Sequence, residues 1–270
     1  MLITMILKRL SIDGLTKRSM LTNVSEVLPE RELKLKIFAD GASKETMLRY
    51  YQDPRIVGFT TNPTLMRRAG VVNYEAFAHE ILAVIKDRPI SFEVFSDDFV
   101  EMEKQAHTIA SWGDNTYIKI PITNTKGEPS LSLIKRLSTA GVKMNVTAMT
   151  LYKQVVETAP VLAEGPGGIV SVFAGRIADA GVDPVPIMKK CVEFLKNCPN
   201  VELLWASPRE LYNLVQAETI GCHIITVTED ILKKLPLLGG DLNQVSLDTV
   251  RMFYNDSQAA RYEIKLLNQQ

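Results

Sequence analysis

Eight short apolar runs alternate with segments of helical periodicity along most of this 270-residue chain, and this alternation limits the possible folds more than any other feature. Between the runs, apolar side chains recur every three or four residues, as on one face of a helix. One helical segment follows Asp97-Asp98, an N-cap signal, and another ends at Gly141. The runs lie at 35–40, 58–62, 90–95, 116–122, 143–149, 169–173, 201–207 and 222–228. Eight strand–helix units in a chain of this length predict an α/β protein with a single closed (β/α)8 TIM barrel.

An open, doubly wound sheet is the structural alternative, but it usually has fewer strands and a glycine fingerprint after the first strand. Here the first run ends in Asp40-Gly41-Ala42-Ser43, which lacks that fingerprint. We place the catalytic barrel at 34–240, after an N-terminal extension at 1–33 that is either a short helix covering the barrel bottom or a disordered arm. Residues 241–270 form a C-terminal tail predicted to be a helix that docks on its own barrel or on a neighbour, which predicts a homo-oligomer.

The composition argues against several classes of partner. Lys+Arg and Asp+Glu both total 31, so no global field attracts nucleic acid or an anionic membrane. The first seven residues are apolar but then meet Lys8-Arg9, which is too short for a signal peptide or a membrane span. The three cysteines, Cys191, Cys198 and Cys222, are odd in number and lack zinc-ligand spacing. They indicate reduced thiols, so a soluble, cytoplasmic protein is expected.

A single cation interrupts the fourth apolar run, which reads Tyr-Ile-Lys-Ile-Pro-Ile with Lys119 at its centre. Lysine is almost never fully buried without a partner or a chemical role. A desolvated lysine is a nucleophilic amine near neutral pH, the form that attacks carbonyl carbons to make a Schiff base. The alternative is an edge strand of alternating pattern, with Lys119 in solvent.

Polar side chains also occur near the ends of the other runs. In a barrel of this kind the active site lies at the carboxyl ends of the strands, so these side chains are predicted to share one mouth. Taken singly each has another explanation, since Asp40 and Asn62 suit helix caps and Ser171 suits a tight core layer. Together they form a cluster expected to bind one another, water or a ligand, because unpaired buried polar groups are costly. The residues are Asp40, Asn62, Glu93, Lys119, Asn145, Thr147, Ser171 and Ser207.

Several segments resemble the transaldolase family, the class I (Schiff-base) aldolases that include the fructose-6-phosphate aldolases. The resemblance runs from about residue 35 to 236. Its specific elements, in this order, are Thr60-Thr61-Asn62-Pro63-Thr64, Lys119-Ile120-Pro121 and Gly175-Arg176-Ile177. The segments Phe38-Ala39-Asp40, Asn145-Val146-Thr147 and Ala206-Ser207-Pro208-Arg209 match as well.

The resemblance implies transfer of a dihydroxyacetone unit from a ketose phosphate to an aldose phosphate, in the manner of the pentose phosphate pathway, without a cofactor or metal. Lys119 would form the imine and Asp40 would transfer a proton at the substrate hydroxyl. Glu93 and Thr147 would hold a catalytic water. The substrate would contact Asn62, Asn145, Ser171, Phe173 and Ser207, and its phosphate would contact Arg176 and Arg209.

Several other features of the sequence have explanations that do not involve this chemistry. The arginines have a plain alternative as exposed ion pairs, Arg176 with Asp179 and Arg209 with Glu210. His79 and His107, in helices, and His223, in the last strand, lack metal-ligand spacing and are expected to be solvated or packed. Gly165-Pro166-Gly167-Gly168 is predicted to be a tight turn, because no Lys-Ser/Thr follows it as in a phosphate loop.

Within the family, the main alternative is an aldolase that releases free dihydroxyacetone. Such aldolases generally carry Gln where this chain has Glu93 and Tyr where it has Phe173, so the two residues favour the transferase. Val172 replaces a usual Pro and Pro208 a usual Phe; with the N-terminal extension, these departures are compatible with a specialised sugar pathway. The alternative from another class of protein is a catalytically silent relative that only binds sugar phosphates. The presence of Lys119, Asp40 and Glu93 argues against this alternative.

Overall fold

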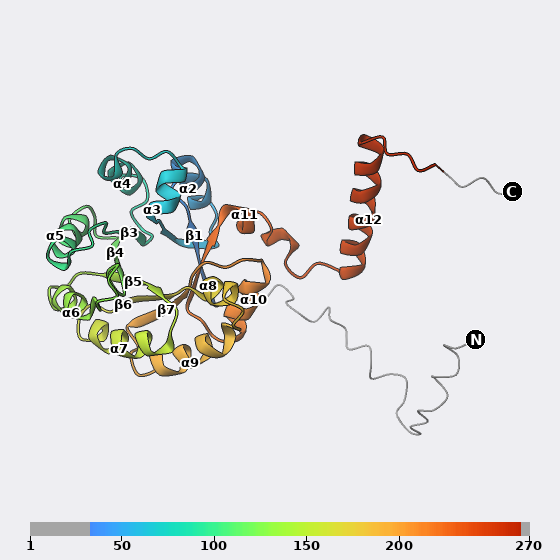
Figure 1. Cartoon of the computed structure of the whole chain (residues 1–270). Coiled ribbons are helices and arrows are strands. Elements are labelled where there is room, and N and C mark those ends of the chain that lie inside the picture. Colours follow the sequence, from blue (N-terminus) through green and yellow to red (C-terminus); the bar gives the residue numbers. More distant parts are fainter. Residues whose placement is uncertain (1–32, 266–270) are drawn as a thin grey trace, which may run out of the picture. The chain divides into compact units, whose positions relative to one another are not determined.

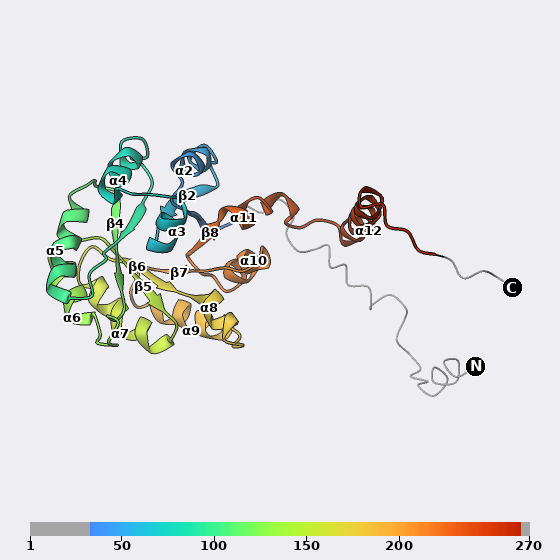
Figure 2. The ribbon, with the colours of Figure 1, turned by 45° about the horizontal axis from the view of Figure 1, so that its top comes forward.

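The computed structural model describes residues 33–265. Its closed barrel of eight parallel strands confirms the predicted (β/α)8 fold. Eight parallel strands close in chain order, β1 pairing with both β2 and β8, and the helices lie around the outside (Figures 1 and 2). The strands are β1 (Lys36–Asp40), β2 (Ile56–Thr60), β3 (Ile90–Glu93), β4 (Thr116–Pro121), β5 (Met144–Met149), β6 (Gly168–Val172), β7 (Val201–Trp205) and β8 (Ile224–Thr228). Each overlaps a predicted run, with ends that differ by at most two residues.

The helices begin and end largely where the sequence signals placed them. Asp98 caps α5 through its side chain, and Pro184 precedes α9. The helices are α2 (Lys44–Tyr51), α3 (Pro63–Arg68), α4 (Tyr74–Leu82), α5 (Phe99–Ala110), α6 (Leu131–Thr139), α7 (Tyr152–Ala163), α8 (Ala174–Asp179), α9 (Val185–Leu195), α10 (Tyr212–Thr219), α11 (Glu229–Leu232), the 3-10 turn η2 (Leu235–Leu237) and α12 (Leu242–Ala259).

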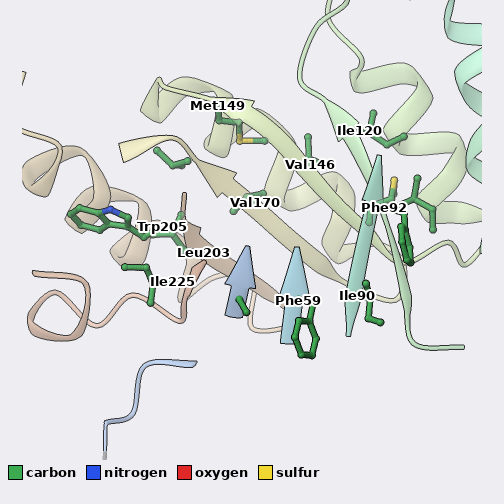
Figure 3. Packing of buried hydrophobic residues seen from close by; sticks show 14 of the residues in the cluster. Phe59, Ile90, Phe92, Ile120, Val146, Met149, Val170, Leu203, Trp205 and Ile225 are labelled. Carbon is green, nitrogen blue, oxygen red and sulfur yellow. The ribbon is translucent and has the colours of Figure 1, made fainter. Parts of the chain in front are cut away.

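The strands divide their side chains between two apolar regions, because successive residues point to opposite faces. The larger region lies between strands and helices. In it Val146, Val170 and Leu203 occupy matching positions on neighbouring strands (Figure 3). A small separate cluster contains Phe38, Ile169, Leu204, Ala206 and Ile224. A Cβ at position 58 would lie 2.5 Å from the Phe38 ring, so Gly58 makes room for that ring.

The chain divides into two compact units, one of which is the barrel at Leu33–Pro236. The other includes α12, in which no side chain is buried. Leu247, Val250 and Phe253 are among its exposed apolar residues. The docking of this tail, and the homo-oligomer inferred from it, stay predictions. The extension at 1–33 lies outside the described residues except for Leu33.

Candidate functional site

A cavity of about 420 Å³ opens at the carboxyl ends of the barrel strands. Leu204, from the small apolar cluster, contributes to its lining, which places the cavity directly on that cluster. All eleven residues singled out in the sequence line this one cavity: Asp40, Asn62, Glu93, Lys119, Asn145, Thr147, Ser171, Phe173, Arg176, Ser207 and Arg209.

Lys119 is buried, so the edge-strand alternative is wrong. Its side chain is only 7% exposed, while Ile118 and Ile120 are fully buried in the large apolar region. Period-two alternation in β4 therefore explains a cation in an apolar run: the isoleucines point outward and Lys119 points inward. Lys119 Nζ lies 3.0 Å from Glu93 Oε2 and donates a hydrogen bond of 2.7 Å to the Thr61 carbonyl oxygen. The amine is thus held by one carboxylate and one backbone dipole.

Asp40, at the end of β1, accepts a hydrogen bond of 2.7 Å from Thr60 Oγ1. Burial raises the pKa of the Asp40 carboxyl above its ordinary value, the Lys119 charge and the Thr60 hydrogen bond oppose that rise, and Glu93 adds to it. The Thr60 hydroxyl is also hydrogen-bonded to Thr226. Asp40 is not a helix cap, since Ser43 caps α2.

A chain of buried hydrogen bonds crosses three strands beside the lysine. Ser171 Oγ donates to Asn145 Oδ1 at 2.6 Å, and Asn145 Nδ2 donates to Ser91 Oγ at 3.1 Å. Asn145 pairs with Lys119 in the register of β4 and β5. These bonds fix the amide, so the polar groups of Asn145 and Ser171 have defined directions at the cavity wall. Ser171 is therefore more than a small residue in a tight layer.

Four other cavity residues differ in their hydrogen bonding or backbone conformation. Thr147 Oγ1 is buried without a hydrogen-bond partner among the described residues. Asn62 Oδ1 accepts a hydrogen bond of 2.9 Å from Leu65 N, so Asn62 is both the cap of α3 and a cavity residue. Ala148 and Ser207 have positive φ, 64° and 56°, although neither is glycine. Such strain is often found at ligand sites.

The two arginines predicted at the mouth lie on adjacent segments, α8 and the loop after β7. Arg209 pairs with Asp179, with Nε 3.1 Å from Oδ1, so neither pair of the alternative explanation, Arg176–Asp179 or Arg209–Glu210, is formed. Among the described residues, Arg176 makes no ion pair. A Cβ at position 175 would overlap the Ser207 carbonyl oxygen. Gly175 thus permits the close approach that brings α8 and the β7 loop together.

Sequence reasoning did not single out several other residues at or behind this cavity, of which four bear on the argument. Arg68, Thr60 and Thr226 line it, and Tyr74 contacts the backbone of Glu93. Arg68 was detectable in principle, because it follows Thr64 by four residues in α3 and so shares its face. The other three depend on contacts between separate elements.

The remaining sequence predictions concern three histidines, a glycine turn, three cysteines, metal binding and membrane spans. His79 and His107 lie in helices as expected, whereas His223 precedes β8 and accepts a hydrogen bond of 2.8 Å from Leu203 N. Gly167 turns the chain into β6 with a φ of 82°. The three cysteines are free and buried. Across residues 33–265, no group of His, Cys, Asp or Glu side chains has a metal-binding arrangement, and no helix is long and apolar enough to cross a membrane.

Solved structures similar to this chain share its fold at low identity. A mandelate oxidase mutant matches with a TM-score of 0.52 and 14% identity, over 83% of this chain and 80% of the other. The KGPDC of Streptococcus mutans matches with a TM-score of 0.51 and 10% identity, over 75% and 91%. At these identities the similarity shows the barrel architecture alone.

Sequence relatives define the family. The family described as transaldolase/fructose-6-phosphate aldolase matches residues 37–265. A probable transaldolase of Dehalococcoides mccartyi is 32% identical, over 74% of this chain and 90% of the relative. A probable transaldolase of Nitrosopumilus maritimus is 30% identical, over 86% of this chain and the full length of the relative. This chain therefore belongs to the transaldolase/fructose-6-phosphate aldolase family.

Proposed function

We propose that this protein is a transaldolase, which moves a dihydroxyacetone unit from a ketose phosphate to an aldose phosphate through a Schiff base on Lys119. The observation that carries the proposal is the buried Lys119 amine, 3.0 Å from the Glu93 carboxylate in a cavity large enough for a sugar. A buried amine beside a proton acceptor has the arrangement that nucleophilic catalysis requires. The transaldolase-type relatives support the same reaction class.

Imine formation needs proton transfers that Glu93 is placed to make. The amine attacks the ketose carbonyl carbon, and the carbinolamine loses its hydroxyl as water. Glu93 lies close enough to exchange protons with Nζ directly. The Thr147 hydroxyl, which has no hydrogen-bond partner within residues 33–265, would hold a water together with Glu93. Asn145 and Ser171 form the fixed wall beside the amine, where they would bind hydroxyls of the three-carbon unit.

Cleavage of the bond between carbons 3 and 4 leaves its electron pair on the three-carbon unit, where the imine stabilises it as an enamine. Asp40 accepts the proton of the carbon-4 hydroxyl, so the departing fragment leaves as an aldehyde. The enamine then attacks the aldehyde carbon of the acceptor, and Asp40 returns the proton to the new hydroxyl. Hydrolysis of the second imine restores the Lys119 amine.

The acceptor's phosphate would bind at Arg176 and Arg209, on adjacent segments of the mouth. Guanidinium groups suit a phosphate dianion because they offer several N–H donors in one plane. The transferase is favoured over an aldolase by Glu93 and Phe173, as argued from the sequence. Phe173 presents no hydroxyl to the cavity that could position water against the enamine.

Borohydride trapping tests the proposal. The full chain is incubated with fructose 6-phosphate and borohydride, and the modified peptide is mapped by mass. Reduction should attach the three-carbon unit to Lys119, and erythrose 4-phosphate should accelerate the consumption of ketose strongly. The absence of an adduct would overturn the Schiff-base mechanism. An adduct with equal rates with and without acceptor, and free dihydroxyacetone accumulating, would place the protein among the aldolases.

A further inference from the structure

Strands β2 and β3 separate next to Lys119, at the point where its amine contacts Thr61. Their register ends at Thr60 opposite Ser91, and Thr61 makes the last contacts, its N–H and hydroxyl both donating to the Ser91 carbonyl oxygen at 3.1 and 2.8 Å. At the next residue the chain turns away to begin α3. The separation frees the Thr61 carbonyl oxygen to accept the hydrogen bond from Lys119.

The same separation leaves Glu93 without a β-strand partner on its β2 side. Backbone N–H and carbonyl groups that are shielded from water need partners, and loss of one is costly. On the other side β3 stays paired with β4, where Glu93 lies opposite Lys119 and Val94 N donates to the Lys119 carbonyl oxygen at 3.2 Å. The residue that carries the carboxylate is therefore held by a strand on one side only.

One tyrosine takes the place of the missing strand. The Tyr74 hydroxyl accepts a hydrogen bond of 2.8 Å from Glu93 N and donates one of 3.1 Å to the Glu93 carbonyl oxygen. Burial raises the pKa of the Tyr74 phenol above its ordinary value, so the phenol keeps the proton that it donates. A single hydroxyl thus satisfies both backbone groups of Glu93.

The Tyr74 ring is itself fixed in position. It makes edge contacts with Phe92, Phe95 and Trp112, at centroid distances of 6.0, 4.5 and 5.7 Å. Tyr74 is also the first residue of α4, which Asn73 caps through a hydrogen bond of 2.9 Å to Ala76 N. A hydroxyl anchored in this way can define the position of the residue that it binds.

We infer that Tyr74 is a positioning residue for Glu93: its hydroxyl holds the end of β3 so that the Glu93 carboxylate meets the Lys119 amine. Only the expected effect of Tyr74 on the reaction rate rests on the proposed function. The placement of the Glu93 carboxylate beside the Lys119 amine is a structural claim that does not depend on it. Tyr74 does not line the cavity, so it acts on the reaction through Glu93.

Tyr74→Phe removes the hydroxyl and keeps the ring. Displacement of a catalytic group by about 1 Å can cost about 100-fold in rate, so kcat should fall by about 10- to 100-fold. KM should change by less than about twofold, since the cavity residues that bind the sugar are untouched. The matched control is Tyr51→Phe, which removes a hydroxyl bonded at 2.8 Å to Asp87, away from the cavity.

A double-mutant cycle with Glu93→Gln separates positioning from general support of the fold. If Tyr74 acts through the Glu93 carboxylate, Tyr74→Phe should change kcat by less than about twofold in the Glu93→Gln background. An equal loss in both backgrounds would overturn the inference. Absence of turnover and of imine in the wild-type protein would instead refute the proposed function.

A labelling experiment tests the placement without any turnover. Limiting acetic anhydride should acetylate Lys119 more extensively in Tyr74→Phe than in the wild-type protein, because a carboxylate displaced from its position 3.0 Å from Nζ no longer blocks the approach of the reagent to the amine. Tyr51→Phe should leave Lys119 labelling unchanged. Equal labelling of Lys119 in all three proteins would overturn the inference, whatever reaction the protein catalyses.

Discussion

The Asp40 carboxylate accepts a hydrogen bond of 2.7 Å from Thr60, yet burial still raises the pKa of Asp40 above the ordinary 3.8. The folded protein therefore binds a proton at Asp40 more tightly than the unfolded chain does. By linkage, this residue's contribution to the free energy of unfolding falls as the pH rises from 3.8 through the raised pKa. Ionised Asp40 thus lowers the free energy of unfolding at the pH where the proposed chemistry uses it.

Asp40→Asn should separate stability from activity. The amide keeps an oxygen for Thr60 and removes the buried charge, so the variant should be more stable than the wild-type protein at pH 7, with the difference shrinking towards pH 4. Turnover should fall by about 100- to 10,000-fold, the usual contribution of a general acid–base group. Thermal unfolding and initial rates across this pH range measure both; lower stability at pH 7 would contradict the assignment of the buried charge.

The dependence of kcat on pH, on the acid side of its maximum, is a second test of Asp40. Because the ionised carboxylate would accept the proton in the proposed cleavage step, kcat should fall as the pH drops through the raised pKa of Asp40, above the ordinary 3.8. An acid limb at the position of an ordinary aspartate, at 3.8 or below, would show that another group controls the step.

Lys119→Arg should keep the fold and remove nearly all turnover. A guanidinium retains its proton in proteins and cannot act as the attacking amine. Lys143→Arg is the matched control, since Lys143 Nζ contacts the Asp114 carbonyl oxygen at 2.8 Å on the exposed surface. Substantial activity in the Lys119 variant, or borohydride trapping on Lys126 or Lys135, would overturn the assignment.

Phe173→Tyr should move the reaction towards release of the three-carbon unit. A hydroxyl at this cavity position could hold water near the enamine, so free dihydroxyacetone should accumulate several-fold faster without an acceptor. Phe194→Tyr is the control, because Phe194 packs against Tyr152 outside the cavity, with ring centroids 6.3 Å apart. An unchanged ratio of transfer to release would mean that Phe173 does not decide between the two reactions.

The barrel and much of its mouth were predictable because the strands are local apolar runs, and seven of the eight runs carry a polar residue that could be singled out. Closure of the barrel brings those ends together, so Lys119 and Asp40 could be assigned to one site without knowing any distance. Pairings between separate elements were not predictable in this way. Arg209 meets Asp179 because Gly175 lets α8 approach the β7 loop, and Tyr74 meets Glu93 because β2 and β3 separate there. Neither relation leaves a periodic signal in the sequence.

Arg68 should attract phosphorylated sugars towards the cavity over a long range. It is exposed, lines the cavity from α3, and makes no ion pair among residues 33–265. Arg68→Ala should lower kcat/KM for phosphorylated sugars by about two- to fivefold at low salt, and the loss should shrink as ionic strength rises. The neighbouring Arg67→Ala is the control, since Arg67 is exposed but does not line this cavity. Equal losses at both positions would remove the role of Arg68.

Arg209 should contribute to binding of the phosphate rather than to stability. Its side chain and that of Asp179 are 47% and 48% exposed, and exposed ion pairs contribute only about 0–1 kcal/mol to stability. A charge-assisted hydrogen bond to a ligand contributes about 1.5–3 kcal/mol. Arg209→Ala should therefore weaken the use of phosphorylated sugars by about 10- to 150-fold, at a tenfold change per about 1.4 kcal/mol.

Asp179→Asn sharpens the test of Arg209, because it keeps a hydrogen-bond acceptor for the guanidinium while removing the competing charge. This variant should use phosphorylated sugars at least as well as the wild-type protein, whereas Arg209→Ala should not. Nonphosphorylated fructose should be affected much less by either change, and the melting temperature should move little. If Arg209→Ala lowers activity towards both substrate classes by the same factor, Arg209 supports the catalytic residues or the fold, and the phosphate assignment fails.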